Sequence, residues 1–377
     1  ISAVWCYWCH VMDETSYSDP DVRRVIDQHF VAVRVDSDHR PDLNARYNVG
    51  GWPTTAFLTG HGGFIAGATY LPPDQFLAML GEVQQAYRED RPRLYDQARE
   101  VLRRRREQVR RVKAGPEIAE YLVDRAARSV AGAYDAANGG FGEEPKFPNA
   151  PVLAFLLHLA RTTGEDFYRA MLQKTLDRMA ASGIYDGEEG GFFRHCAKAD
   201  WSEPQWEKLL EDNLNLTQVY LDAWLLFDND GYRQVPARTI DYTLEHLFDE
   251  GASAFHGSQG AHSGYFGLPS SLRRESANPP VDPSCYAGVN ARAVPLLLDA
   301  SWKLGRPGLE SAALSVLAAL DARALAGELS HVYGESAEGG TPAYLGDWAH
   351  LLNALLAAHR HTAQEGYLEL AKAVALQ

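Results

Sequence analysis

The sequence has 377 residues, enough for two or three domains, and its 46% hydrophobic and 23% charged residues are ordinary for a globular protein. No apolar run approaches the roughly 20 residues of a membrane-spanning helix, and the formal net charge of −14 disfavours nucleic acid as a partner. Four cysteines with one closely spaced pair indicate a reducing compartment, so we predict a cytoplasmic protein without a disulfide scaffold.

The chain opens with two cysteines that lie between a short apolar run and a helical pattern. Cys6 and Cys9 are separated by Tyr7 and Trp8. A thiolate is the species that attacks disulfides, and the positive end of a helix dipole lowers a cysteine pKa. We therefore predict a redox pair in which Cys6 is the exposed nucleophile and Cys9 closes the disulfide. Tyr7 and Trp8 are expected to tune the reduction potential.

Two other interpretations of these cysteines stay open. Cys-x-x-Cys-His is also the spacing of a c-type haem attachment site. Cys6, Cys9 and His10 could instead supply three ligands of a zinc site. The remaining cysteines, Cys196 and Cys285, are solitary, and the haem interpretation does not explain the pattern downstream. We favour the dithiol and predict no metal and no cofactor.

The next stretch alternates between helix and strand signals. Two glycines precede Trp52 and Pro53, and the proline enters an apolar strand, which is unusual for a central strand. The pattern is typical of a cis bond between Trp52 and Pro53 in a tight turn. The expected elements, in order, are a helix at 21–30 capped by Asp19, a buried β-branched strand at 31–36, a strand within 53–58, a hairpin turn at 61–63, a strand at 64–69 and a helix at 73–87.

Several short motifs occur together in residues 1–90: Trp8-Cys9-His10-Val11-Met12, Val35-Asp36, Arg40-Pro41-Asp42, Gly50-Gly51-Trp52-Pro53 and Phe57-Leu58-Thr59. With them the segment resembles the thioredoxin-like domain of the spermatogenesis-associated protein 20 family. In that family the residue between the cysteines that corresponds to Tyr7 is usually His. The resemblance implies an α/β fold in which the proline faces the dithiol and an extended substrate pairs beside it.

The same resemblance implies a substrate site and a missing strand. Residues expected to contact a protein or small-molecule thiol or disulfide are Trp5, Tyr7, Trp8, Trp52 and Pro53. Residues 1–4 are too few for the central strand that a thioredoxin-like sheet needs before its dithiol, so we expect the sequence to be incomplete at its start.

Residues 91–115 are predicted to form a basic helical linker. Between 91 and 113 there are ten Lys or Arg and three acidic residues, a local charge of 10 − 3 = +7. An anionic partner such as RNA would suit this charge, but charge runs are usually solvated helix faces. We interpret the segment as a solvated helix lying across an acidic second domain. Gly115 and Pro116 predict the boundary.

The third predicted region, 116–377, is helical almost throughout and shows no strand signal. Glycine-aromatic turns such as Gly139-Gly140-Phe141-Gly142 and Gly190-Gly191-Phe192-Phe193 separate helix pairs, which indicates an array or toroid of hairpins. This half resembles the six-hairpin glycosidase-like (α/α) barrel of the same family. Because such a barrel has twelve helices, we expect an incomplete or shortened one. Nine helices are predicted, at 117–133, 151–162, 166–181, 205–227, 235–248, 284–304, 308–324, 345–360 and 364–376.

Carboxylates beside an aromatic-lined cavity are what glycoside chemistry requires. The candidate carboxylates are Asp186, Glu207, Asp212 and Asp347; the candidate sugar platforms are Tyr185, Trp201, Trp206 and Trp348; the candidate bases are His195, His262 and His350. Helical spacing favours a core role for Trp206, and Gln205 stands where relatives usually have His, which weakens an acid–base scheme.

These observations predict a thiol–disulfide oxidoreductase whose barrel selects substrates or partners. A carbohydrate-active or carbohydrate-binding barrel, with a structural thioredoxin-like domain, is the alternative. A third interpretation is a binding or chaperone-like module without turnover. Fold analogy alone does not decide among the three.

Overall fold

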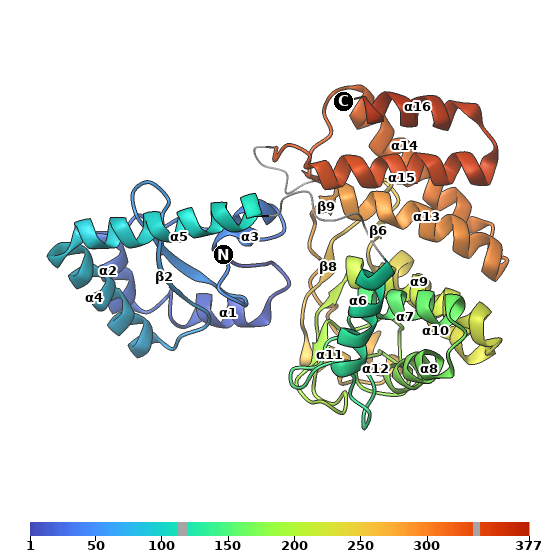
Figure 1. Ribbon diagram of the computed structural model, residues 1–377, viewed down its shortest axis with the longest axis horizontal. Coiled ribbons are helices and arrows are strands. Elements are labelled where there is room, and N and C mark those ends of the chain that lie inside the picture. The colour runs from blue at the N-terminus through green and yellow to red at the C-terminus, as the bar shows by residue number, and fades with distance from the viewer. Residues whose placement is uncertain (112–119, 335–339, 377) are drawn as a thin grey trace. The chain divides into compact units, whose positions relative to one another are not determined.

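The structure is a computed structural model that describes residues 1–111, 120–334 and 340–376 (Figure 1). The chain divides into two compact units, Ile1–Leu122 and Val123–Gln377, which we call unit 1 and unit 2. None of the helices in the described ranges combines the length and the apolar composition that crossing a bilayer requires.

Unit 1 combines helices with one antiparallel hairpin. Phe57 of β1 lies opposite Ala66 of β2, and α2 packs on α4 over a core that includes Met12, Phe57 and Phe76. The side chain of Asp19 accepts hydrogen bonds from the first backbone N–H groups of α2, as predicted. The elements are α1 Tyr7–Glu14, α2 Pro20–His29, α3 Pro41–Tyr47, β1 Thr55–Leu58, β2 Phe64–Ala68, α4 Pro73–Glu89 and α5 Arg91–Arg111.

The basic segment is helical as far as Arg111; it packs on α4 and β2 of unit 1, and Arg105 donates a hydrogen bond to the Arg46 carbonyl of α3. Ala98 is buried, whereas the arginines at 103 and 104 are exposed and pair with Glu100 on the same helix. The helix therefore has one packed stripe and one solvated face.

The strand expected at 31–36 is not formed, and this prediction is wrong. A parallel bridge joins Ser2 to Asp36, but Val31 and Val33 are 93% and 76% exposed. Within the described residues only Ser2 pairs with this segment, so its β-branched side chains have no sheet on which to pack. The hairpin β1–β2 is thus a smaller sheet than an α/β domain leads one to expect.

Unit 2 is built from helix pairs. In each pair the second helix packs on the first, and contacts between α7 and α9, α9 and α13, and α13 and α15 join the first helices into one inner layer (Figure 1). The pairs are α7 Ala150–Thr162 with α8 Asp166–Ala180, α9 Leu210–Phe227 with α10 Asp230–His246, α13 Ala287–Leu304 with α14 Gly308–Leu325, and α15 Leu345–Thr362 with α16 Glu365–Ala375.

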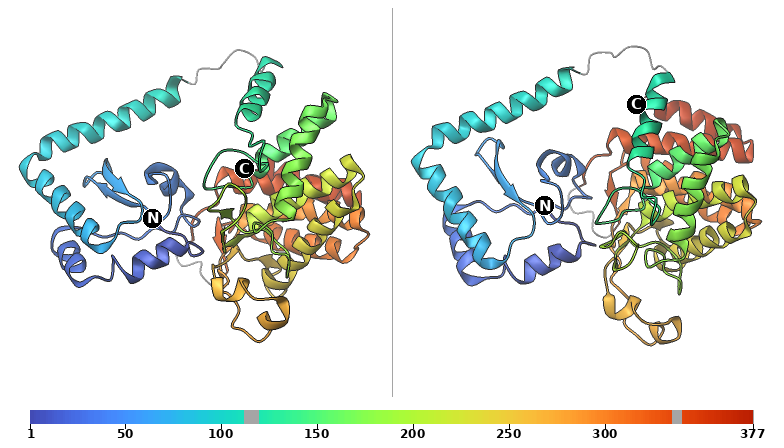
Figure 2. Two further views of the ribbon diagram at one scale, coloured as in Figure 1. Left: turned by 90° about the horizontal axis from the view of Figure 1, so that it is seen from below. Right: turned by 60° about the horizontal axis from the view of Figure 1, so that its bottom comes forward.

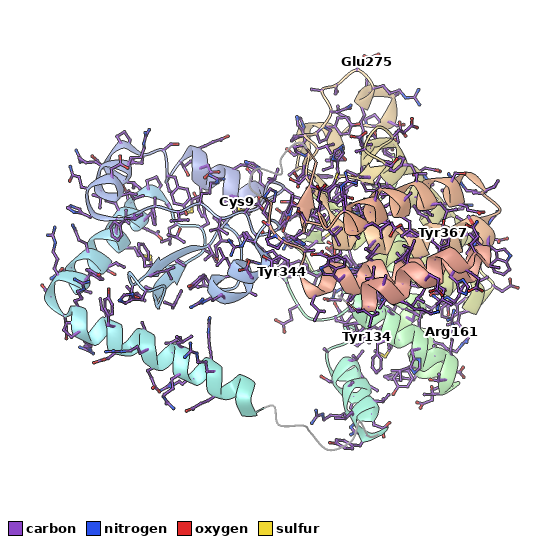
Figure 3. The ribbon with its side chains drawn as sticks, turned by 90° about the horizontal axis from the view of Figure 1, so that it is seen from above. Cys9, Tyr134, Arg161, Glu275, Tyr344 and Tyr367 are labelled. Carbon is purple, nitrogen blue, oxygen red and sulfur yellow. A yellow bond between two sulfur atoms is a disulfide. The ribbon has the colours of Figure 1, made fainter. Side chains whose placement is uncertain are left out.

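Three further helices complete the described part of unit 2. The helix α6 covers Glu120–Gly132, and residues 117–119 of the helix expected there lie outside the described residues. The short helices α11 Ser263–Phe266 and α12 Ser270–Arg273 lie in a segment that projects from the rest of the unit (Figure 2). Glu275 lies at the tip of this projection (Figure 3).

Short strands occur in the connections of unit 2, contrary to the expectation of a region without strands. Each has two residues and pairs with a strand distant along the chain or across a tight turn. Two residues are too few to form the alternating pattern that predicts a strand from the sequence. The pairs are β3 His195–Cys196 with β4 Pro204–Gln205, β5 Lys208–Leu209 with β8 Ser258–Gln259, β6 Phe248–Asp249 with β7 Ala254–Phe255, and β9 Cys285–Tyr286 with β10 Val332–Tyr333.

These strands also correct two helix starts and place three helix ends together. The helices expected at 205–227 and 284–304 begin at Leu210 and Ala287, because the preceding residues are extended. The pairs β5–β8 and β9–β10 tie together the connections that lead into α9, α13 and α15. The N-terminal ends of these helices therefore lie at one end of unit 2, which we call the barrel rim. Tyr344 marks it at the start of α15 (Figure 3).

Candidate functional site

The two cysteines of the motif form a disulfide at the start of α1. Cys6 immediately precedes the helix, its Sγ accepts a hydrogen bond from the backbone N–H of Cys9 at 3.2 Å, and the two Cα atoms are 5.2 Å apart. A spacing of three residues at a helix start thus brings the two sulfur atoms together. Cys6 is only 4% exposed, so the prediction of an exposed nucleophile is wrong for this oxidised form. Cys9 is 2% exposed, so both members of the disulfide are buried.

The predicted cis bond is present, and its segment pairs with the residues that precede the disulfide. The Trp52–Pro53 bond is cis. Backbone hydrogen bonds of 2.7 and 2.9 Å join Ile1 to Thr54, and the rings of Trp5 and Trp52 make an edge contact with centroids 5.6 Å apart. Two segments more than 40 residues apart are therefore paired at this site.

The aromatic residues of the motif point in different directions. Tyr7 and Trp8 are 49% and 48% exposed, and Trp8 contacts Tyr70 at 5.1 Å between ring centroids. Trp5 is buried and donates a hydrogen bond of 2.7 Å to Asp38. Among the predicted substrate contacts, Tyr7 and Trp8 can thus meet a partner directly, whereas Trp5 supports the site from within.

The residues at the disulfide do not fit a zinc centre. The Nε2 atom of His10 lies 2.7 Å from the carbonyl oxygen of Val4. Across residues 1–111, 120–334 and 340–376, no group of three or more His, Cys, Asp or Glu side chains is arranged to hold a metal ion. A structural zinc site needs four such ligands.

Asp186, one of the predicted barrel carboxylates, lies in a buried ion-pair network. Its Oδ2 is 2.7 Å from both the Lys208 ammonium and the Arg273 guanidinium, and Arg273 also contacts Glu189 at 3.0 Å. Burial raises the pKa of Asp186, but the two cations outweigh it and leave the pKa below its usual value. Because Asp186 and Lys208 are both buried, this carboxylate joins two connections and is not placed to reach a ligand.

The aromatic platforms expected in the barrel are mostly occupied by the protein itself. Trp201 is fully buried and donates to the Asn138 carbonyl at 3.1 Å, so the prediction of a sugar platform there is wrong. Trp206 is partly buried, lies in the extended residues between β4 and β5, and stacks on Phe266 with centroids 6.1 Å apart. Tyr185 contacts Phe192, whereas Trp348 packs partly buried against the core.

Two of the predicted bases, His195 and His262, and the predicted carboxylate Asp347 each make contacts with other parts of the protein. His195 stacks on Phe147 at 4.6 Å, and burial, followed by the charge of Arg194, lowers its pKa to about 4. His262 is exposed and accepts a hydrogen bond that caps α11. Asp347 is buried, lies 2.9 Å from His331 Nδ1, and accepts the backbone N–H of Tyr344 before α15 and that of Gly288 in α13.

Asp212 and His350 remain at the barrel rim. Both are partly exposed, Asp212 in the first turn of α9 and His350 in the second turn of α15. Burial and then the neighbouring Glu211 carboxylate raise the pKa of Asp212 to about 6, against the charges of Arg194 and Arg292. Glu207, five residues before Asp212 in the sequence, is buried. Its backbone carbonyl accepts a hydrogen bond of 2.8 Å from the backbone N–H of Arg194.

Arg194, Glu211 and Arg292 were not predicted from the sequence. Arg292 carries a recognisable signal, because it is a single charge between Ala291 and Ala293 in an otherwise apolar part of its helix. Arg194 and Glu211 stand in mixed polar surroundings, and their proximity to Asp212 depends on tertiary structure alone. Two surface depressions lie along α8 and beside the start of α10.

A family model matches a segment that lies within unit 1. A family model named Thioredox_DsbH, described as a protein of unknown function, DUF255, matches residues 1–105. Spermatogenesis-associated protein 20 of Homo sapiens is 30% identical over 279 residues, which are 68% of this chain and 35% of that protein. Uncharacterized protein B0495.5 of Caenorhabditis elegans is 34% identical over 239 residues, 58% of this chain and 32% of that protein. The chain spans about a third of the length of these relatives.

Two solved structures resemble the chain over most of its length. A sugar epimerase from a ruminal bacterium covers 68% of this chain and 69% of its own, with a TM-score of 0.54 and 16% identity. A D-mannose isomerase covers 69% and 71%, with a TM-score of 0.51 and 10% identity. At such identities the likeness shows the fold alone, which is a helix-rich, barrel-like arrangement of the kind found in sugar-processing enzymes.

Proposed function

Because the chain belongs to the family of spermatogenesis-associated protein 20, we propose that it is a thiol–disulfide oxidoreductase with a thioredoxin-like first unit. The observation that carries the proposal is the disulfide between Cys6 and Cys9 at the start of a helix, beside a cis proline. The exposed rings of Tyr7 and Trp8 flank it and offer apolar contact to a partner. The barrel of unit 2 would select that partner.

The exchange can be written with atoms and electrons balanced. In the reduced form, the Cys6 thiolate attacks a substrate disulfide, the bond between the two substrate sulfur atoms breaks, and one of them leaves as a thiolate. The Cys9 thiolate then attacks the Sγ of Cys6 in the mixed disulfide, which closes the disulfide of the protein and releases the second substrate thiolate. The substrate gains two electrons from the protein. The N–H of Cys9 and the helix dipole favour the charged form of Cys6.

Substitution of each cysteine tests this proposal. We expect Cys6→Ser to abolish reduction of insulin disulfides by dithiothreitol-charged protein, and Cys9→Ser to accumulate a mixed disulfide with glutathione that mass spectrometry detects. Redox titration of the wild type should show a two-electron transition that both variants lack.

The chain supplies its own control in Cys196→Ser and Cys285→Ser. Both thiols are buried, and burial raises the pKa of each to about 12, so they are poor nucleophiles. Their replacement should leave turnover unchanged. Turnover that survives Cys6→Ser, or that disappears with Cys285→Ser, contradicts the assignment.

A second candidate function is carbohydrate binding or conversion by unit 2. It is supported by the fold shared with the two sugar enzymes and by the raised pKa of the partly exposed Asp212, a property that suits proton transfer near neutral pH. A signal from a sugar bound to the full chain, unaffected by Cys6→Ser, would favour this candidate.

A further inference from the structure

Three inner helices bring polar side chains of both charges to the barrel rim. Asp212 and Glu211 lie in the first turn of α9, Arg292 in the second turn of α13 and His350 in the second turn of α15. The strand pairs β5–β8 and β9–β10 hold these helix starts together. Acidic, basic and imidazole side chains from three different hairpins are thus brought to the same end of unit 2.

Arg292 connects the side chains of this group. Its guanidinium donates to Glu211 and to Asn215, both on α9. Burial and then the charge of Arg292 lower the pKa of His350, whereas the charge of Glu211 raises it. Gly288 has no side chain, and this permits α15 to lie close to the first turn of α13. A Cβ at Gly288 would be 2.7 Å from Asp347 Oδ1 and 3.5 Å from His350 Cδ2, both on α15.

Asp212 differs from the neighbouring carboxylates in its bonding. Asp347 is occupied by His331 and by backbone N–H groups, and Glu211 is paired with Arg292. Within the part of the chain that the structure describes, no hydrogen bond or ion pair to the Asp212 carboxyl is found, although this side chain is only partly exposed. A half-buried carboxyl in this state has acceptor capacity to offer a ligand.

The charges around Asp212 nearly cancel. Arg194 and Arg292 are cationic, whereas Glu211 and Asp212 are acidic. Burial and then Arg292 lower the pKa of His350, so its imidazole is neutral and can donate through one nitrogen and accept through the other. Such a group offers both donors and acceptors of hydrogen bonds. Hydroxyl groups, which donate and accept, are complementary to it.

We propose that Asp212, Arg292 and His350 at the barrel rim bind a neutral polyhydroxylated ligand, a sugar or a polyol. The proposal deepens the second candidate function and rests on it, since it names the place and the ligand class for carbohydrate binding by unit 2. The buried Asp186 is not part of this site.

The test is ligand-observed saturation-transfer NMR on the full chain with D-mannose, D-glucose and myo-inositol, and with D-glucuronate as the charged comparison. The variants are Asp212→Asn and Arg292→Met. A matched control is available in Asp241→Asn, because the exposed pair of Arg306 and Asp241 resembles the pair of Arg292 and Glu211 in exposure but lies away from the rim.

We expect at least one neutral probe to bind the wild type and the Asp241→Asn variant alike. In Asp212→Asn and Arg292→Met its affinity should fall about tenfold or more, the loss that accompanies removal of a hydrogen bond to a charged group. Circular dichroism would confirm that both variants are folded.

Three results would overturn the inference in different ways. Equal binding of a neutral probe by the folded rim variants and the wild type would place the site elsewhere and leave carbohydrate binding by unit 2 standing. Binding of glucuronate alone would show that the ligand class is wrong. No binding of any probe to the wild type would reject both this inference and the second candidate function.

Discussion

The raised pKa of Asp212 has a consequence for the stability of the protein. Its pKa, raised from 3.8 to about 6, means that the folded protein retains a proton which the unfolded chain has lost between about pH 4 and pH 6. Stability therefore falls as the pH rises through this window, and the penalty is complete above pH 6. At about 1.4 kcal/mol per pKa unit the penalty is at most about 3 kcal/mol.

Replacement of Asp212 by Asn should remove this penalty. We expect the Asp212→Asn variant to unfold at a higher temperature than the wild type at pH 7.5, and the difference to vanish below pH 4, where the wild-type carboxyl is protonated. The gain should exceed the few tenths of a kcal/mol that a carboxylate at a helix start contributes through the dipole.

Thermal unfolding followed by circular dichroism at both pH values measures the effect. Asp124→Asn, on the exposed face of α6, is the matched control and should shift the midpoint little at either pH. A lower midpoint for Asp212→Asn at pH 7.5 would show that the carboxylate is stabilised where it lies, contrary to the raised pKa.

At this scale the sequence identifies residue types better than their surroundings. The spacing of Cys6 and Cys9 is a local feature, and the pairing of the two sulfur atoms needs only one helix turn. Asp186 and Trp201 have side chains of the types that sugar binding uses, but their partners Lys208 and Asn138 lie more than 20 residues away in the sequence. Burial of that kind depends on contacts that no short sequence pattern encodes.

At the scale of elements, a repeated asparagine joins each connection to the helix that follows it. The side chain of Asn213 accepts the Phe192 N–H at 2.6 Å and donates to the carbonyls of Phe192 and Leu209. Asn290 makes the same set of bonds with Phe255 and Tyr286 on the next inner helix. Both asparagines are fully buried. Each supplies the hydrogen bonds that the backbone of the preceding connection needs in a place where water cannot supply them.

Loss of this side chain should be costly. In Asn213→Ala the N–H and carbonyl of Phe192 lose their partner in a buried place, and each such group costs about 1–3 kcal/mol. We expect the free energy of unfolding to fall by about 3 kcal/mol, as measured by urea denaturation, with Leu225→Ala on the exposed face of α9 as the control.

The isosteric variant Asn213→Asp sharpens the experiment. A carboxylate can still accept from the Phe192 N–H, but it faces the carbonyls of Phe192 and Leu209 with no proton to donate. We expect it to destabilise the protein as much as Asn213→Ala does. Tolerance of Asp at this position would mean that the N–H bond alone holds the connection.

The elements themselves were predicted unevenly for a physical reason. Amphipathic helices such as α2 and α4 repeat their apolar residues over several turns, and their bounds agree closely with those expected. The two-residue strands, and the segment 31–36 without a sheet, depend on which partner lies beside them. The Trp52–Pro53 turn was predictable because glycine and proline restrict the backbone locally.

For the whole molecule, the positions of the hydrophobic cores suggest how it unfolds. Unit 1 has a core that includes Phe76 and Leu80 between its helices and the hairpin. Unit 2 has two clusters, one around Leu297 and Leu355 and one around Leu176, and Trp224 packs against both. Units that each bury their own core commonly unfold in separate transitions.

Calorimetry of the full chain should therefore show two transitions. Leu80→Ala, which truncates a 1% exposed side chain in unit 1, should lower one of them, and Leu297→Ala, also 1% exposed, should lower the other. Each truncation is expected to cost about 2–5 kcal/mol within its own unit. Reduction of the disulfide of Cys6 and Cys9 should move only the transition that Leu80→Ala moves, because both cysteines belong to unit 1. A single transition shifted equally by both substitutions would instead mean that the units unfold as one, and reduction of the disulfide would then shift that same transition.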